Sequence, residues 1–257
     1  MLNFTEYGTQ NDKKSLLIVH GLFGSARNWG VISKRLSDDR HVVTVDMRNH
    51  GESGWHDSHT YADLAGDLAE VIGNFDGNMD VLGHSMGGKA GMVLALTQPD
   101  LVNRLLVADI APVTYGHTQT PLINAMKSLD LSQVERRSDA DRLLAEEIPE
   151  DSVRAFLFQS LDVKAKRWRL NHDALIANME HIIGFPNDMT GLYQGPALFL
   201  SGGASDYVLA EHRPEIRRLF AKPYFAKVPN VGHWLHAEKP REFEASIRAF
   251  LMHKFSY

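Results

Sequence analysis

The chain has 257 residues, with 27 Lys and Arg against 32 Asp and Glu, so its formal net charge is −5. Its 44% of hydrophobic residues can fill one sizeable core, and we expect one domain that carries an insertion. The acidic balance offers no broad basic surface, so nucleic acid is not expected as a partner. The absence of cysteine excludes disulfides, thiolate zinc sites and cysteine nucleophiles.

The first ten residues carry Glu6 and contain no apolar stretch of the length that a signal peptide needs. The longest uncharged run of mostly small and apolar residues, Ala90 to Leu96, is far shorter than the ~20 residues that span a bilayer. The sequence therefore predicts no membrane insertion and a cytoplasmic location. It indicates nothing about the oligomeric state.

Short β-branched runs alternate with amphipathic stretches in the first half of the chain, a pattern typical of βαβ units. The runs are apolar throughout, which indicates strands of a mostly parallel sheet with helices on both faces. Strands are expected at residues 15–19, 41–45, 79–82, 104–108, 197–200 and 225–228, and late helices at 209–220 and 240–253.

Between about Pro112 and Gly195 the strand pattern gives way to charged amphipathic helices, such as residues 140–147 and 174–183. We therefore expect an α/β core domain over residues 1–111 and 196–257. Residues 112–195 are predicted to form a helical cap, inserted between two late strands. A block at the carboxyl ends of parallel strands would lie over the crevice in which such sheets bind ligands.

The segment Gly83-His84-Ser85-Met86-Gly87 fits the pattern G-x-S-x-G. It follows the predicted strand 79–82 and opens a helical run, which is the strand, tight turn and helix of a nucleophile elbow. The turn strains the backbone at the serine, and side chains at either glycine would clash with neighbouring backbone. We predict that Ser85 is a nucleophile.

A serine nucleophile needs an imidazole base and a carboxylate that orients the imidazole. His233 is the candidate base among the 13 histidines, because it lies in a loop between the last predicted strand and the final helix. Asp109 and Asp206 compete for the acid role. Each follows a predicted strand, so position alone does not choose between them.

The oxyanion of a tetrahedral intermediate needs backbone N–H donors. The loop His20 to Gly24 follows the first predicted strand and can supply one of them. We assign the N–H of Leu22, with Phe23 as the neighbouring alternative. The second donor is expected from Met86, the residue after the nucleophile.

Other signals are weaker. His56 and His59, like His233 and His236, have a spacing that metals sometimes use, but no further ligand completes a site, so neither a metal nor another cofactor is expected. Lys89 is interpreted as a supporting or surface residue. The basic run 164–169 is interpreted as a solvated face, with the binding of an anionic substrate tail as the alternative.

Five blocks in order resemble the α/β-hydrolase superfamily, and specifically the YbfF-type bacterial esterases and their eukaryotic abhydrolase relatives. They are HGLFGS (20–25), VDMRNHGES (45–53), GHSMGGKA (83–90), DIAPV (109–113) and PNVGHWLHAEKP (229–240). The resemblance implies a Ser/Asp/His hydrolase with a helical cap that acts on short acyl esters and also, in some cases, on acyl thioesters. It favours Asp109 slightly, because that branch does not always carry an acid where Asp206 stands.

The sequence thus predicts a serine carboxylesterase that passes through an acyl-serine intermediate and prefers short-chain esters. The alternatives are an acyl-CoA thioesterase and a non-catalytic ligand-binding protein on the same fold. The substrate pocket is expected to include the aromatic residues Phe156, Phe158, Trp168 and Trp234. The competing interpretation is that some of these side chains fill the core of the cap instead.

Overall fold

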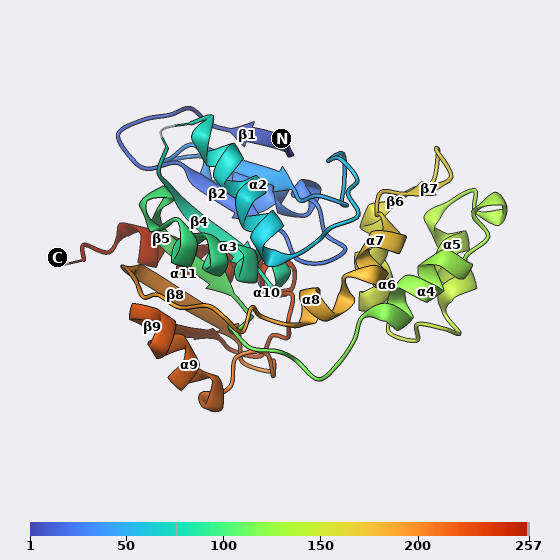
Figure 1. The fold of residues 1–257 in the computed structure, drawn as a ribbon. Helices are drawn as coiled ribbons and strands as arrows, with labels where there is room; N and C mark the ends of the chain where they lie inside the picture. Colours follow the sequence, from blue (N-terminus) through green and yellow to red (C-terminus); the bar gives the residue numbers. More distant parts are fainter. Residues whose placement is uncertain (76, 256–257) are drawn as a thin grey trace.

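The computed structural model describes residues 1–75 and 77–255. Its central sheet has seven strands in the order β1-β3-β2-β4-β5-β8-β9 (Figure 1). All neighbouring strands are parallel except β1, which pairs antiparallel with β3. The strands are β1 (Asn3–Tyr7), β2 (Leu16–Val19), β3 (Val42–Asp46), β4 (Met79–His84), β5 (Val102–Ala108), β8 (Tyr193–Gly202) and β9 (Phe220–Val228). This is the mostly parallel sheet that the sequence predicts.

Helices cover both faces of the sheet, which explains why β2, β3 and β4 are buried along their whole length. One apolar cluster packs α2 (Tyr61–Gly73), α3 (Met86–Thr97) and α9 (Arg213–Leu219) on one face. The other cluster packs α1 (Gly30–Leu36) and α11 (Pro240–Met252) on the opposite face. Four short helices lie in the connections: η1 (Ala26–Trp29), η2 (Pro99–Leu101), η5 (Ala210–His212) and α10 (Leu235–Glu238).

The chain between β5 and β8 forms a group of short helices beside the sheet (Figure 1). It contains one small antiparallel pair of strands, which the sequence pattern did not reveal. The elements are α4 (Thr120–Ser128), η3 (Leu131–Gln133), α5 (Arg137–Leu144), α6 (Asp151–Leu157), η4 (Phe158–Ser160), β6 (Leu161–Asp162), β7 (Arg167–Trp168), α7 (His172–Ala177) and α8 (Met179–Ile183). We propose that this segment is the cap.

Several elements differ from the expectation. The strand β1 was not predicted, because its residues are polar or partly exposed at the sheet edge. The expected helix 174–183 is broken at Asn178, whose side-chain amide donates to the carbonyls of Ala174 and Asp57, both at 2.8 Å. The strand β9 begins at Phe220, where the expected helix ended.

The longest helices, α2 and α11, have 13 residues each. Among the residues that the structure describes, none of the helices is long and apolar enough to cross a membrane.

Candidate active site

Ser85 lies in the sharp turn between β4 and α3, with φ 52° and ψ −120°. This positive φ is rare for a residue with a side chain, and a nucleophile elbow requires it. A Cβ atom at Gly83 would lie 2.2 Å from the carbonyl oxygen of Gly87, and one at Gly87 would lie 2.5 Å from that of Val19. The two glycines of the motif are therefore required by the close approach of the backbone.

Asp109 follows β5 directly and is completely buried. Its Oδ2 accepts a hydrogen bond from His233 Nδ1 at 2.8 Å, and its Oδ1 accepts one from the backbone N–H of Gly202 at 2.9 Å. The hydroxyl of Ser205 also donates to Oδ2. These three donors hold the carboxylate in one orientation and satisfy its hydrogen-bonding capacity in the absence of bulk water.

The structure does not bring Asp206 to this histidine. Its side chain is exposed, and it makes no hydrogen bond or ion pair with residues 1–75 and 77–255. The strand β8 ends at Gly202, and the loop that follows points the hydroxyl of Ser205, rather than the carboxylate of Asp206, at Asp109. Sequence reasoning did not identify Ser205.

Two further residues hold His233 in position. The ring of Tyr207 stacks on the imidazole, with centroids 4.0 Å apart and planes at 24°. His84 Nε2 donates to the backbone carbonyl of His233 at 2.8 Å. Burial lowers the pKa of His84 well below its ordinary value, so this ring stays neutral and supports the loop without adding charge beside His233.

Ser85 and His233 line the same cavity of about 320 Å³. Its walls come from the loops after β2, β4, β5 and β9 and from the segment between β5 and β8. In the described part of the chain no hydrogen bond is formed between Ser85 Oγ and His233. Such contacts are often loose in an enzyme without substrate and tighten when substrate binds.

Of the four aromatic residues expected in the pocket, the cavity is lined by Phe156 and Trp234, whose rings lie 5.2 Å apart. Phe158 and Trp168 do not line it, and that part of the expectation is wrong. They stack on each other with centroids 6.2 Å apart inside the apolar core. Residues two apart on a helical stretch point roughly 200° away from each other, so Phe156 and Phe158 face different sides.

The loop His20 to Gly24 borders the cavity beside Ser85. Phe23 has φ 65°, and its backbone N–H already donates to His50 Nε2 at 3.2 Å. The backbone N–H groups of Leu22 and Met86 make no hydrogen bond with the rest of the described chain, and both residues line the cavity. Leu22 and Met86, rather than Phe23, thus have free donors there.

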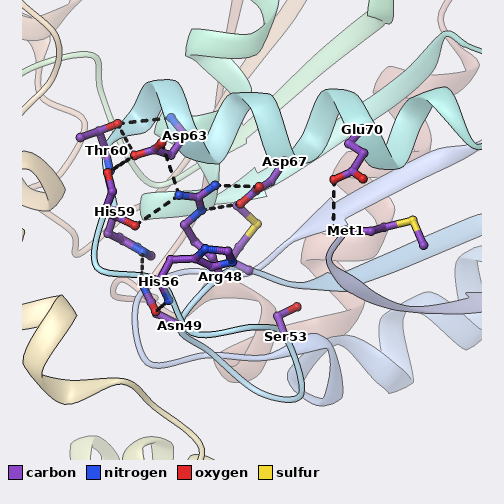
Figure 2. Close-up of polar contacts among 12 residues, drawn as sticks. Met1, Arg48, Asn49, Ser53, His56, His59, Thr60, Asp63, Asp67 and Glu70 are labelled. Carbon is purple, nitrogen blue, oxygen red and sulfur yellow. Dashed lines mark hydrogen bonds and ion pairs between the residues drawn. The ribbon is translucent and has the colours of Figure 1, made fainter.

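Polar contacts hold the loop after β3 to itself and to α2 (Figure 2). Arg48 donates to both carboxylate oxygens of Asp67, at 2.6 and 2.8 Å. The side chain of Asn49 accepts from the backbone N–H of His56 at 2.8 Å and contacts His59 Nδ1 at 3.2 Å. His50 Nδ1 donates to the carbonyl of Arg48 at 2.9 Å, which orients its Nε2 to accept from the N–H of Phe23.

Lys89 is buried rather than on the surface, with 1% of its area exposed. Its ammonium group donates to the carbonyls of Ile183 at 2.8 Å and Gly184 at 2.5 Å. Burial lowers the pKa of Lys89 to about 7. The lysine also lines the cavity, which the sequence could not reveal because the end of α8 covers it only in the folded chain.

The histidine pairs with metal-like spacing are engaged elsewhere. His59 contacts Asn49, and His236 stacks on Trp29 with ring centroids 4.3 Å apart. Within residues 1–75 and 77–255, no three side chains of His, Cys, Asp or Glu gather in a group that could hold a metal ion.

A parallel sheet with a serine elbow after one strand, a buried aspartate after the next and a histidine after the last defines an α/β hydrolase. The model of the alpha/beta hydrolase family matches residues 16–246, and the chain belongs to this family. Several of its matched relatives are named as lipases or esterases, and this chain is a hydrolase as well.

Among its relatives is the sn-1-specific diacylglycerol lipase ABHD11 of Danio rerio, which is 40% identical over 97% of this chain and 82% of its own length. Esterase YbfF of Escherichia coli is 34% identical over 94% of both chains. A solved structure described as a marine microorganism esterase superimposes with a TM-score of 0.91 and 35% identity, covering 97% of this chain and 98% of its own.

Proposed function

We propose that the protein is a serine carboxylesterase in which Ser85 is the nucleophile, His233 the general base and Asp109 the orienting acid. The observation that carries this proposal is the 2.8 Å contact between His233 Nδ1 and a buried, triply hydrogen-bonded Asp109, beside a cavity that Ser85 also lines. With Nδ1–H donated to the carboxylate, Nε2 carries the lone pair that can accept the serine proton.

The reaction proceeds in two halves. Ser85 Oγ attacks the ester carbonyl carbon while His233 Nε2 takes its proton, and the backbone N–H groups of Leu22 and Met86 donate to the oxyanion. The C–O bond to the alcohol breaks as the imidazolium returns the proton to the leaving oxygen. Water, deprotonated by His233, then attacks the acyl-serine, and the acid is released with Ser85 restored.

The names of the relatives, an esterase and a lipase, support ester substrates for this chain. The cavity volume of about 320 Å³ is at the small end of ligand pockets and supports a preference for acyl groups of roughly two to six carbons. A non-catalytic role is not retained, because Ser85, Asp109 and His233 are all available.

The acyl-CoA thioesterase alternative is not favoured. None of the relatives cited above is named a thioesterase. The basic run 164–169 was the candidate for binding the phosphates of coenzyme A. In this run, Lys166 pairs with Glu135 at 2.9 Å and Arg169 pairs with Asp162 at 2.7 Å. No residue of that run lines the cavity among the described residues.

The proposal is tested by substitution of the nucleophile and the base. Ser85→Ala and His233→Ala should each lower kcat for p-nitrophenyl butanoate by roughly 10⁴-fold or more, because members of a triad act as a unit. Circular dichroism should show that both variants fold. A folded Ser85→Ala variant that keeps a tenth or more of the activity would overturn the proposal.

A further inference from the structure

The cavity that Ser85 lines contains an unusual charge. Among its lining residues in the described chain, Lys89 is the one Lys or Arg, and none is Asp or Glu. The other walls are largely aromatic and aliphatic, with Ile110, Leu122 and Phe156 among them. An amino group that is cationic when protonated therefore lies in an apolar chamber without a carboxylate in its lining.

The protein satisfies the hydrogen bonds of Lys89 only in part. Two of the three ammonium N–H groups donate to the carbonyls of Ile183 and Gly184. The rings of Tyr115 and Tyr61 lie 4.8 and 5.8 Å from Nζ and offer weak cation–π attraction. Lys89 forms no ion pair within residues 1–75 and 77–255. Buried charges are usually paired, so a counter-charge is missing.

The position of Lys89 relates it directly to the nucleophile. It follows Ser85, the residue that precedes α3, by four residues; its backbone N–H donates to the carbonyl of Ser85 at 3.1 Å, and both residues line the cavity. Helical side chains tilt toward the amino-terminal end of the helix, so the long lysine side chain leans toward the turn that carries Ser85. A substrate held at Ser85 by its ester carbonyl can therefore reach the ammonium with a chain of a few carbons.

We propose, given the esterase function above, that Lys89 forms a carboxylate subsite and that the preferred substrates are esters carrying a second, free carboxylate group. The carboxylate accepts the third N–H of Lys89 in a charge-assisted hydrogen bond. In a cavity without negative side chains, this pair supplies the missing counter-charge. Burial alone lowers the pKa of Lys89 to about 7, and a bound carboxylate would favour its charged form again.

The test compares matched esters on the wild-type protein. p-Nitrophenyl pentanoate and mono-p-nitrophenyl glutarate share a five-carbon acyl group and differ in its terminal carboxylate. Butanoyl esters of butanol and of 4-hydroxybutanoate place the same difference on the alcohol side. The ratio of kcat/KM, acidic over neutral ester, should be roughly tenfold or more in at least one pair.

Lys89→Met should lower that ratio by roughly tenfold or more, because methionine keeps most of the length of the side chain but removes the charge. The ratio is the quantity to read, since the substitution also removes two hydrogen bonds to the end of α8 and affects both esters. Lys164→Met, which replaces an exposed lysine outside the cavity, should leave the ratio unchanged and serves as the matched control.

If Lys89→Met does not fold, inhibition of the wild-type protein decides the question: pentanoate should inhibit neutral-ester hydrolysis more strongly than pentanamide, which has the same size but no charge. Ratios near one in both pairs, a ratio that Lys89→Met leaves intact, or equal inhibition by pentanoate and pentanamide would overturn the carboxylate subsite. Hydrolysis of the neutral esters reports the esterase function separately, so its absence would count against that function instead.

Discussion

Position in the sequence does not choose between Asp109 and Asp206, the family resemblance favours Asp109 slightly, and the fold separates the two by burial. Asp109 is fully buried and accepts three hydrogen bonds, whereas Asp206 is exposed. The motif and the chain order suffice to nominate Ser85 and His233. The choice of acid depends on which loop reaches the histidine. The path of a loop depends on tertiary packing, so it cannot be predicted from the local sequence.

We predict that Asp109→Asn lowers kcat by roughly 10³- to 10⁴-fold, because an amide cannot hold His233 in the tautomer that accepts the serine proton. Asp206→Asn is the matched control and should retain activity close to that of the wild type. Steady-state kinetics on variants whose folding is checked by circular dichroism measures both. A large loss in Asp206→Asn with little loss in Asp109→Asn would reverse the assignment.

Lys89 leads to a prediction about stability and pH. Its pKa is lowered from 10.5 to about 7 by burial, so between these values the unfolded chain binds a proton that the folded chain does not. Stability from this group therefore rises with pH, by up to roughly 1.4 kcal/mol per unit. The neighbouring tyrosines do not titrate in this window, because burial raises the pKa of Tyr61 and Tyr115.

The measurement is the free energy of unfolding in urea for the wild type and Lys89→Met at pH 7.5 and 9. The wild type should gain stability relative to the variant as the pH rises. A difference between the two proteins that is the same at both values would show that Lys89 has an ordinary pKa in the folded state.

Among the elements, apolar periodicity predicts the buried strands and the flanking helices well, since both signals arise from burial. It fails where polar contacts decide the backbone. Asn178 divides α7 from α8 through hydrogen bonds to Ala174 and Asp57, the second of which is 121 residues away in the chain. Edge strand β1 is missed because one side of it faces solvent.

The helical stretch α6–η4 gives a matched pair of substitutions. Phe156 lines the cavity, and Phe158 is buried in the core beside Trp168. We expect Phe156→Ala to enlarge the cavity and to shift the preferred p-nitrophenyl ester toward longer acyl chains. Phe158→Ala should keep the wild-type chain-length profile but destabilise the protein by about 3–5 kcal/mol.

Profiles of kcat/KM over acyl chains of two to twelve carbons, together with urea unfolding, distinguish the two phenylalanines. If Phe158→Ala changed the profile and Phe156→Ala did not, the assignment of Phe156 to the cavity wall would be wrong.

In the molecule as a whole, the cavity is built by segments that are far apart in sequence. The loops after β2, β4, β5 and β9 meet at one edge of the sheet, as the carboxyl ends of parallel strands must. That meeting point is predictable from the order of strands and motifs. The segment that covers this meeting point is not predictable from the sequence. The contact of Lys89 with Ile183, for example, depends on how the inserted helices pack.

The central claim is that Ser85 forms a covalent acyl intermediate with the help of His233 and Asp109. The most direct measurement is intact-mass analysis after treatment with a p-nitrophenyl alkylphosphonate, followed by peptide mapping. We expect one phosphonyl adduct per chain on the wild type, located on Ser85, and none on Ser85→Ala under the same conditions. An unmodified wild type, or an equal adduct on Ser85→Ala, would contradict the account.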